Sequence, residues 1–187
     1  MLNFQSSSPV LVVGPGRSGT TVTARLLHER LGVHMGSRFR PDPQGKSHYE
    51  DLAFKDLNDH FLSNRLNFNE WLGGVQRLVF ERIEMDKPWG FKDPRASYLV
   101  GLYLMFFDDP KFIRCRRRHD KILESMLRNY EWTKDQAENI IQERELALDR
   151  FLKGREVLEL NFDEFIPEED LEEKLKIFLN GGRGHEG

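Results

Sequence analysis

The feature that most constrains this chain is a glycine-rich stretch near its beginning, PVLVVGPGRSGTTVTAR at residues 9–25. Its first five residues are apolar and mostly β-branched, which is typical of a parallel strand covered on both faces. Three glycines then permit a tight turn, and apolar residues at helical spacing follow: Gly14, Gly16 and Gly19, then Val22, Leu26 and Leu27. Backbone N–H groups and the positive end of the helix dipole converge at such a turn, so the stretch predicts a phosphate-binding site.

The loop differs at one position from the P-loop of nucleotide hydrolases, G-x-x-x-x-G-K-[ST]. Gly14 and Gly19 have the required spacing and Thr21 supplies the hydroxyl, but Thr20 stands at the lysine position. The cation lies inside the loop instead, at Arg17. Without the lysine that spans the β- and γ-phosphates, the loop is poorly equipped for ATP hydrolysis. It suits a single 5′-phosphate that carries a transferable group.

The composition excludes several classes of protein. At 187 residues, the chain is long enough for one α/β domain, which we expect to span residues 1–187. A formal net charge of −3 gives no general attraction to nucleic acids or membranes, so we expect neither as a partner. The single cysteine, Cys115, excludes a disulfide within the chain and is expected to be an inert core thiol. The six histidines show no metal-ligand spacing.

The sequence also bears on the compartment in which the protein works. No run approaches the length of a bilayer-spanning helix, about 20 apolar residues. The first residues, MLNFQSSSP, have no basic region followed by an apolar stretch and hence no export signal. We therefore expect a cytoplasmic protein.

Strand and helix patterns alternate along the rest of the chain. Apolar runs predict further strands at residues 88–92, 111–116 and 157–160. Amphipathic patterns predict helices at residues 20–31, 50–62, 68–82, 96–107, 119–129, 133–152 and after Pro167. The segment 33–49, rich in glycine, proline and basic residues, is expected to be a long functional loop. The alternation predicts an α/β fold, a P-loop-type parallel sheet with helices on both faces, which binds ligands at the carboxyl ends of its strands.

Two more chemical signals fall at the carboxyl ends of predicted strands. Lys92 ends one strand, and Arg117 ends another, eight residues before Ser125 in the following helix. An arginine at a strand end and a hydroxyl from the second helical turn could close on one phosphate, because the planar guanidinium donates two parallel hydrogen bonds. The alternative is that the basic run 114–118 is simply a solvated surface.

Together these residues resemble the sulfotransferase superfamily, in its bacterial and tyrosylprotein-sulfotransferase-like branch. Members use 3′-phosphoadenosine-5′-phosphosulfate (PAPS) as the sulfuryl donor and leave the 3′,5′-bisphosphate (PAP) as product. The family's motifs have counterparts along most of the chain: the loop [KR]-S-G-T-[TS] at residues 17–21, the pair R-x₇-S at Arg117 and Ser125, K-D-P at residues 92–94, G-x-x-E-[DN] at residues 47–51, and the closing strand, turn and helix at residues 157–180.

The resemblance implies a role for each matched residue. The loop would hold the 5′-phosphate through its N–H groups and hydroxyls, at Gly16, Arg17, Ser18, Gly19, Thr20 and Thr21. Arg117 and Ser125 would hold the 3′-phosphate. Arg17 would stabilise charge on the bridging oxygen, and Lys92 would support the departing or transferring oxygens. Since fixed cations would do this work, no metal is expected.

The acceptor, a hydroxyl or amine on a small molecule, carbohydrate or peptide, also needs a base. Glu50 is our choice, because it is expected to open a helix and matches the family's acidic position. His48 competes because its ordinary pKa is nearer neutrality, and either residue could have no catalytic part. The chain departs from the family at His119, where proline is frequent, and offers only Arg183 and Gly184 for the C-terminal donor contacts.

Two other functions stay open, together with the oligomeric state. One is a P-loop kinase that uses Mg-ATP on a small molecule or nucleoside. It would need an acidic magnesium ligand, and LMFFDDP at residues 104–110 resembles such a strand. The spacing argues against that interpretation, because residues 96–107 suffice for a helix and the next strand begins after Pro110. The other is a non-catalytic nucleotide-binding protein.

Overall fold

Four parallel strands form the central sheet of the protein. The computed structural model describes residues 8–41, 47–107 and 109–181. In spatial order, the strands are β4 (Gly90–Lys92), β1 (Val10–Val13), β5 (Lys111–Arg116) and β6 (Val157–Asn161). Leu11 of β1 lies opposite Phe91 on one side and Phe112 on the other. The α/β fold with a parallel sheet, predicted from the sequence, is confirmed.

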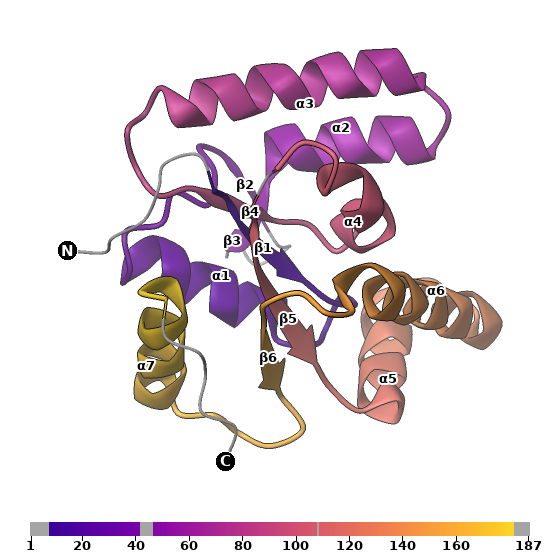
Figure 1. Ribbon diagram of the computed structural model, residues 1–187. Coiled ribbons are helices and arrows are strands. Elements are labelled where there is room, and N and C mark those ends of the chain that lie inside the picture. Colours follow the sequence, from indigo (N-terminus) through magenta and orange to yellow (C-terminus); the bar gives the residue numbers. More distant parts are fainter. Residues whose placement is uncertain (1–7, 42–46, 108, 182–187) are drawn as a thin grey trace.

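Helices cover both faces of this sheet (Figure 1). On one face lie α1 (Thr20–Glu29) and α7 (Glu168–Leu179); on the other lie α2 (Leu52–Leu62), α3 (Phe68–Ile83), α4 (Ala96–Tyr103) and α6 (Lys134–Leu152). The remaining helix, α5 (His119–Asn129), packs against α6. Because side chains alternate along a strand, Leu11 and Val13 enter one core and Val10 and Val12 the other.

A small antiparallel ribbon occupies part of the segment expected to be a long loop. It consists of β2 (Phe39–Pro41) and β3 (Ser47–Asp51), so Glu50 lies in a strand and does not open a helix as expected. The reason is a helix cap. Asp51 has an extended backbone and its side chain accepts a hydrogen bond from the Ala53 N–H at 3.0 Å, which makes Leu52 the first helical residue.

Two further features differ from expectation: the end of one helix and the place of Arg117, which was expected to end a strand. The helix expected at 96–107 ends at Tyr103, because the Met105 and Phe106 N–H groups donate to carbonyls three residues back and tighten the chain into turns. Strand β5 ends at Arg116, one residue before Arg117. It begins directly after Pro110, so LMFFDDP is not a strand as far as it is described; Asp108 lies outside the described residues.

The core thiol was predicted correctly. Cys115 is fully buried in β5, and burial raises the pKa of its thiol to about 12. Within the described ranges, no helix combines the length and apolar character needed to cross a membrane.

Candidate active site

The glycine loop between β1 and α1 is folded tightly against its neighbours. Gly14 and Gly19 have positive φ angles of 139° and 98°, which favour glycine. A Cβ atom on Gly14 would meet the Cys115 carbonyl oxygen at 2.4 Å, and one on Gly19 would meet the Phe162 ring at 2.3 Å. The loop therefore approaches the end of β5 and the segment after β6 so closely that a larger residue would displace it.

The side chains of this loop divide into inward and outward groups. Ser18 is fully buried and its hydroxyl donates to the Pro15 carbonyl at 2.7 Å, a contact that shapes the loop, and its part in binding the 5′-phosphate stays a prediction. Thr20 is also buried, with 3% of its surface exposed. Arg17 is exposed, and its Nε donates to the Ser125 hydroxyl at 2.9 Å. Gly16 lies near α5, since a Cβ there would be 3.8 Å from the Met126 methyl group.

Arg117 and Ser125, the expected second anion site, lie directly beside the loop. The Arg117 guanidinium donates to the Arg17 carbonyl oxygen at 3.3 Å, while Ser125 accepts from the Arg17 side chain. Arg117 also lies two residues before α5, whose N-terminus carries the positive end of a helix dipole. The structure thus brings the two motifs together, although 100 residues separate Arg17 from Arg117.

Lys92, the last residue of β4, joins the loop to the ribbon. Its ammonium donates to Glu50 Oε1 at 3.1 Å, to the His48 carbonyl at 3.2 Å and to the Thr21 hydroxyl at 3.4 Å. The side chains of Lys92 and Glu50 are only 3% and 7% exposed. Burial lowers the pKa of Lys92, and the charge and hydrogen bond of Glu50 oppose that shift.

The two candidate bases differ in how they approach Lys92. Glu50 presents its carboxylate, whereas His48 makes its contact through the backbone carbonyl. A general base must lie within hydrogen-bond reach of the acceptor's proton, and a carboxylate beside a phosphate-type loop is placed for that task. Both candidate bases thus lie beside Lys92, and the choice of Glu50 as the base stays a prediction.

A buried polar network behind Lys92 was missed in the sequence. Asp93 is fully buried and accepts hydrogen bonds from the Asn58 amide at 3.0 Å and from Arg95. Asn58 in turn accepts from Trp71 Nε1 at 3.2 Å and from the Tyr103 hydroxyl at 2.8 Å. One signal could have revealed it: Asn58 follows Phe54 by four residues, which puts a polar residue on the buried face of α2.

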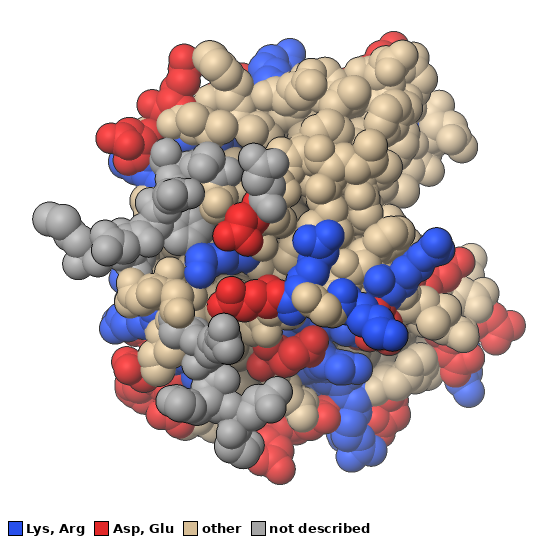
Figure 2. All heavy atoms as spheres, viewed as in Figure 1, with Lys and Arg blue, Asp and Glu red and all other residues tan. Residues whose placement is uncertain are grey.

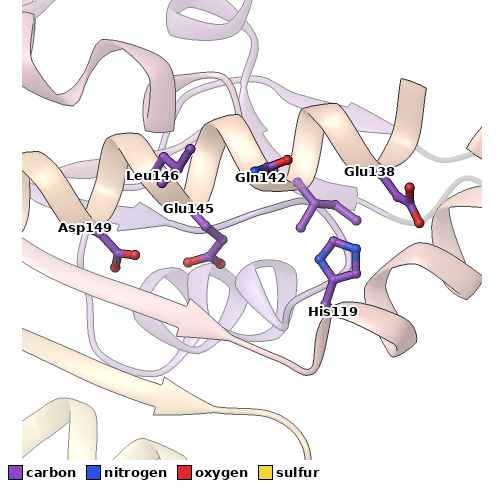
Figure 3. Close-up of a pocket in the computed structure, with 7 residues that line it drawn as sticks. His119, Glu138, Gln142, Glu145, Leu146 and Asp149 are labelled. Carbon is purple, nitrogen blue, oxygen red and sulfur yellow. The ribbon is translucent and has the colours of Figure 1, made fainter. Parts of the chain in front are cut away.

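A cavity of about 430 Å³ lies beside this site, between the start of α5 and one side of α6 (Figure 3). His119 reaches toward α6 from the first turn of α5, and Glu138, Gln142 and Glu145 lie along the facing side of α6 (Figure 3). A second cavity of about 240 Å³ shares His119 and Glu145 and extends to Arg117. The second cavity thus reaches the candidate site at Arg117, and Lys92 lines neither cavity.

Charge is unevenly distributed on the face shown in Figure 2. Lys and Arg side chains gather in its centre and lower half, interspersed with Asp and Glu, while the surface over α2, α3 and α4 at the upper right is largely uncharged. Among the described residues, no group of three or more His, Cys, Asp or Glu could hold a metal ion. Arg183 and Gly184 lie outside the described residues.

Comparison with known proteins adds independent information. A family model described as "Sulfotransferase family" matches residues 9–172. The sulfotransferase domain of the olefin synthase from Synechococcus PCC 7002 is 14% identical, covers 96% of this chain and 77% of its own, and has a TM-score of 0.61. Sulfotransferase STF1 from Mycobacterium tuberculosis H37Rv is 15% identical, with coverages of 94% and 68% and a TM-score of 0.56.

A kinase shares the fold as well. A sugar kinase from Janibacter sp. HTCC2649 is 15% identical, with coverages of 93% and 95% and a TM-score of 0.59. Since these solved structures are only 14–15% identical to this chain, their similarity shows a shared fold and no shared activity. A comparison with curated protein sequences finds no match.

Proposed function

The chain belongs to the sulfotransferase family, and from that premise we propose that it transfers a sulfuryl group from PAPS to a hydroxyl or amine acceptor. One observation carries the proposal: the Lys92 ammonium connects the Glu50 carboxylate to the Thr21 hydroxyl of the glycine loop. A fixed cation, a candidate base and a phosphate-type loop therefore meet within hydrogen-bond distance.

The arrangement of anion-binding groups supports PAPS as the donor. The loop and Arg17 suit a 5′-phosphosulfate, and Arg117 with Ser125 suits a 3′-phosphate. Arg17 contacts both Ser125 and Arg117, so the glycine loop and the second anion-binding pair are adjacent. This arrangement suits the two phosphates of one nucleotide. Thr20, at the position of the P-loop lysine, removes the group that would span the phosphates of ATP.

The chemistry then follows from alignment and charge stabilisation. The acceptor oxygen or nitrogen forms a bond to sulfur while the bond from sulfur to the bridging oxygen breaks, and that oxygen leaves with the electron pair. Glu50 takes the proton of the acceptor. Arg17 and Lys92 stabilise the charge that develops on the leaving and non-bridging oxygens, so the residues need no metal for this step. The proposed acceptor is a small molecule, carbohydrate or peptide, and screening these classes identifies it.

Calorimetry with PAP and with Mg-ATP, each with and without a chelator, tests the donor. We expect PAP to bind more tightly and its affinity to be independent of magnesium. Transfer of label from ³⁵S-PAPS to a panel of acceptors tests the reaction. Tighter binding of Mg-ATP would favour the kinase, and PAP binding without transfer to any acceptor class would favour a nucleotide-binding protein that is not an enzyme.

A further inference from the structure

Tyr49, which lies between the two candidate bases, has an unusual backbone conformation. Its φ angle is 51°, in the left-handed region that favours glycine and disfavours a bulky side chain. Such a conformation costs conformational energy and persists only where the surrounding contacts hold it, and it occurs preferentially at functional sites. The reaction described above gives Tyr49 no part.

The pairing of β3 with β2 is irregular at the same place. Phe39 pairs with Asp51 and Pro41 pairs with Ser47, so a single residue of β2 lies opposite three residues of β3. Tyr49 is the middle one of these three. A bulge of this kind changes the direction of side chains and is common beside active sites. The irregular pairing and the left-handed residue therefore belong to one local turn in β3.

This turn brings two groups of β3 to the same atom. In a regular strand, carbonyl groups lie in the plane of the sheet and side chains stand perpendicular to it. The His48 carbonyl and the Glu50 side chain would therefore point in different directions. Here the Lys92 ammonium donates to both, at 3.2 Å and 3.1 Å. The turn at Tyr49 thus allows both contacts.

Contacts of Tyr49 with its neighbours hold the turn in place. Its hydroxyl donates to the carboxylate of Glu29, the last residue of α1. Its ring packs against Phe39 of β2 and His28 of α1, with ring centroids 5.0 Å and 6.1 Å apart. Its backbone N–H donates to the Ser47 hydroxyl at 3.0 Å. The side chain therefore fastens β3 to α1, the helix that begins at the glycine loop (Figure 1).

We propose that Tyr49 is a positioning residue: its anchored side chain keeps β3 in the left-handed turn that directs the Glu50 carboxylate and the His48 carbonyl to Lys92. The inference rests on the proposed function, in which Glu50 takes the proton of the acceptor. Tyr49 makes and breaks no bond in that step and acts through the position of Glu50. Since a displacement of about 1 Å can cost on the order of 10²-fold in rate, the anchor affects catalysis from outside the site.

Substitutions at position 49 test the backbone conformation. Glycine adopts a positive φ freely, whereas a β-branched residue resists it. We expect Tyr49→Val to lower kcat about 10²-fold, and Tyr49→Gly to lower it less although glycine is the smaller residue. Tyr49→Phe keeps the ring contacts and should retain most of the activity. Affinity for PAP, measured by calorimetry, should stay nearly unchanged in all three variants, because the glycine loop is not altered.

Asp86 provides a matched control, because its φ angle of 50° is almost the same as that of Tyr49. It is exposed and precedes β4, whereas Lys92 is the last residue of that strand. Asp86→Val should lower Tm in a thermal scan and leave kcat unchanged. If Tyr49→Val does not fold, Tyr49→Ala and Asp86→Ala make the same comparison, since alanine is also unfavourable at a positive φ.

The ionisation of Lys92 reports the position of Glu50 without turnover. Burial lowers the pKa of Lys92, and Glu50 opposes that shift more strongly than Asp93 and Cys115 do. Of these three groups, only Glu50 belongs to β3. NMR titration of ¹³C-labelled lysine follows Lys92, with its signal assigned by loss in Lys92→Arg. The midpoint should move to lower pH in Tyr49→Val, in the same direction as in Glu50→Gln, and should not move in the control.

Equal kcat in Tyr49→Gly and Tyr49→Val, or an equal loss of kcat in Asp86→Val, would overturn the inference. So would an unchanged titration of Lys92 in Tyr49→Val, or a loss of PAP affinity as large as the loss of kcat. Failure of the proposed function is distinguishable, because it appears as absent sulfuryl transfer in the unaltered protein, whereas the NMR titration needs no turnover.

Discussion

At the scale of single residues, Glu50 has both a structural role and a proposed catalytic role. It compensates the charge of Lys92, whose side chain is only 3% exposed, and it is the proposed acceptor of the proton. These tasks can be separated by experiment, because a neutral side chain of the same shape preserves the contact and cannot act as a base.

We expect Glu50→Gln to lower turnover about 10²- to 10⁴-fold and to leave donor affinity nearly unchanged, as measured by single-turnover kinetics and calorimetry. His48→Asn is the control. The contact of His48 with Lys92 is a backbone carbonyl, which the substitution retains, so its effect on rate should be small. Full activity in Glu50→Gln with loss in His48→Asn would instead make His48 the base.

Arg117→Ala removes a charge-assisted contact with the proposed 3′-phosphate. Affinity for PAP should fall by roughly 30- to 1000-fold, or about 2–4 kcal/mol, while nucleotides without the 3′-phosphate bind almost as before. Calorimetry measures both. The neighbouring Arg116, whose side chain is 51% exposed, provides the control variant Arg116→Ala. An equal loss for both kinds of nucleotide would mean that Arg117 has a structural role.

At the scale of elements, one ion pair fixes the strand that carries Glu50. Asp51, the last residue of β3, caps α2 and accepts from Arg82 of α3 at 2.6 Å. The two side chains are only 2% and 4% exposed. The pair therefore ties β3 to two helices directly beside the candidate base.

We expect Asp51→Ala to lower the free energy of unfolding by about 3–5 kcal/mol, because it removes the cap and leaves the Arg82 charge buried without its carboxylate. Asp51→Asn retains a good cap and should lose less. Urea unfolding followed by tryptophan fluorescence measures the effect. The control is Glu124→Ala, which breaks an exposed pair with Arg128 on α5 and should cost less than about 1 kcal/mol. Equal losses of unfolding free energy in Asp51→Ala and Glu124→Ala would contradict a stabilising role for the buried ion pair.

The elements also show what can be predicted from a sequence. β1, the glycine loop and α1 were predictable, since strand, turn and helix signals are local there. The same holds for α5, predicted with its observed bounds. The ribbon of β2 and β3 was not predictable, because the pairing of a strand depends on a partner outside its own segment. The hydrogen bond between Asn58 and Asp93 was missed for a related reason, since only packing brings the two residues together.

At the scale of the whole molecule, the donor should stabilise the fold. A ligand at 100 times its dissociation constant adds about 2.7 kcal/mol to the free energy of unfolding. For a chain of this size, Tm should rise by roughly 5–10 °C with PAP in a thermal scan, with or without a chelator. The same concentration of PAP should shift Arg117→Ala much less. A larger shift with Mg-ATP than with PAP would contradict the proposed donor.

The hydrogen bond between Arg17 and Ser125 has a consequence for the order of folding. Its partners lie 108 residues apart, and the contact of Gly14 with Ser97 spans 83 residues. Contacts of such separation form late, since the chain must close a long loop before gaining from them. We therefore expect that the nucleotide binds only after α5 has docked. It then stabilises the folded chain and does not speed the folding of the unfolded chain.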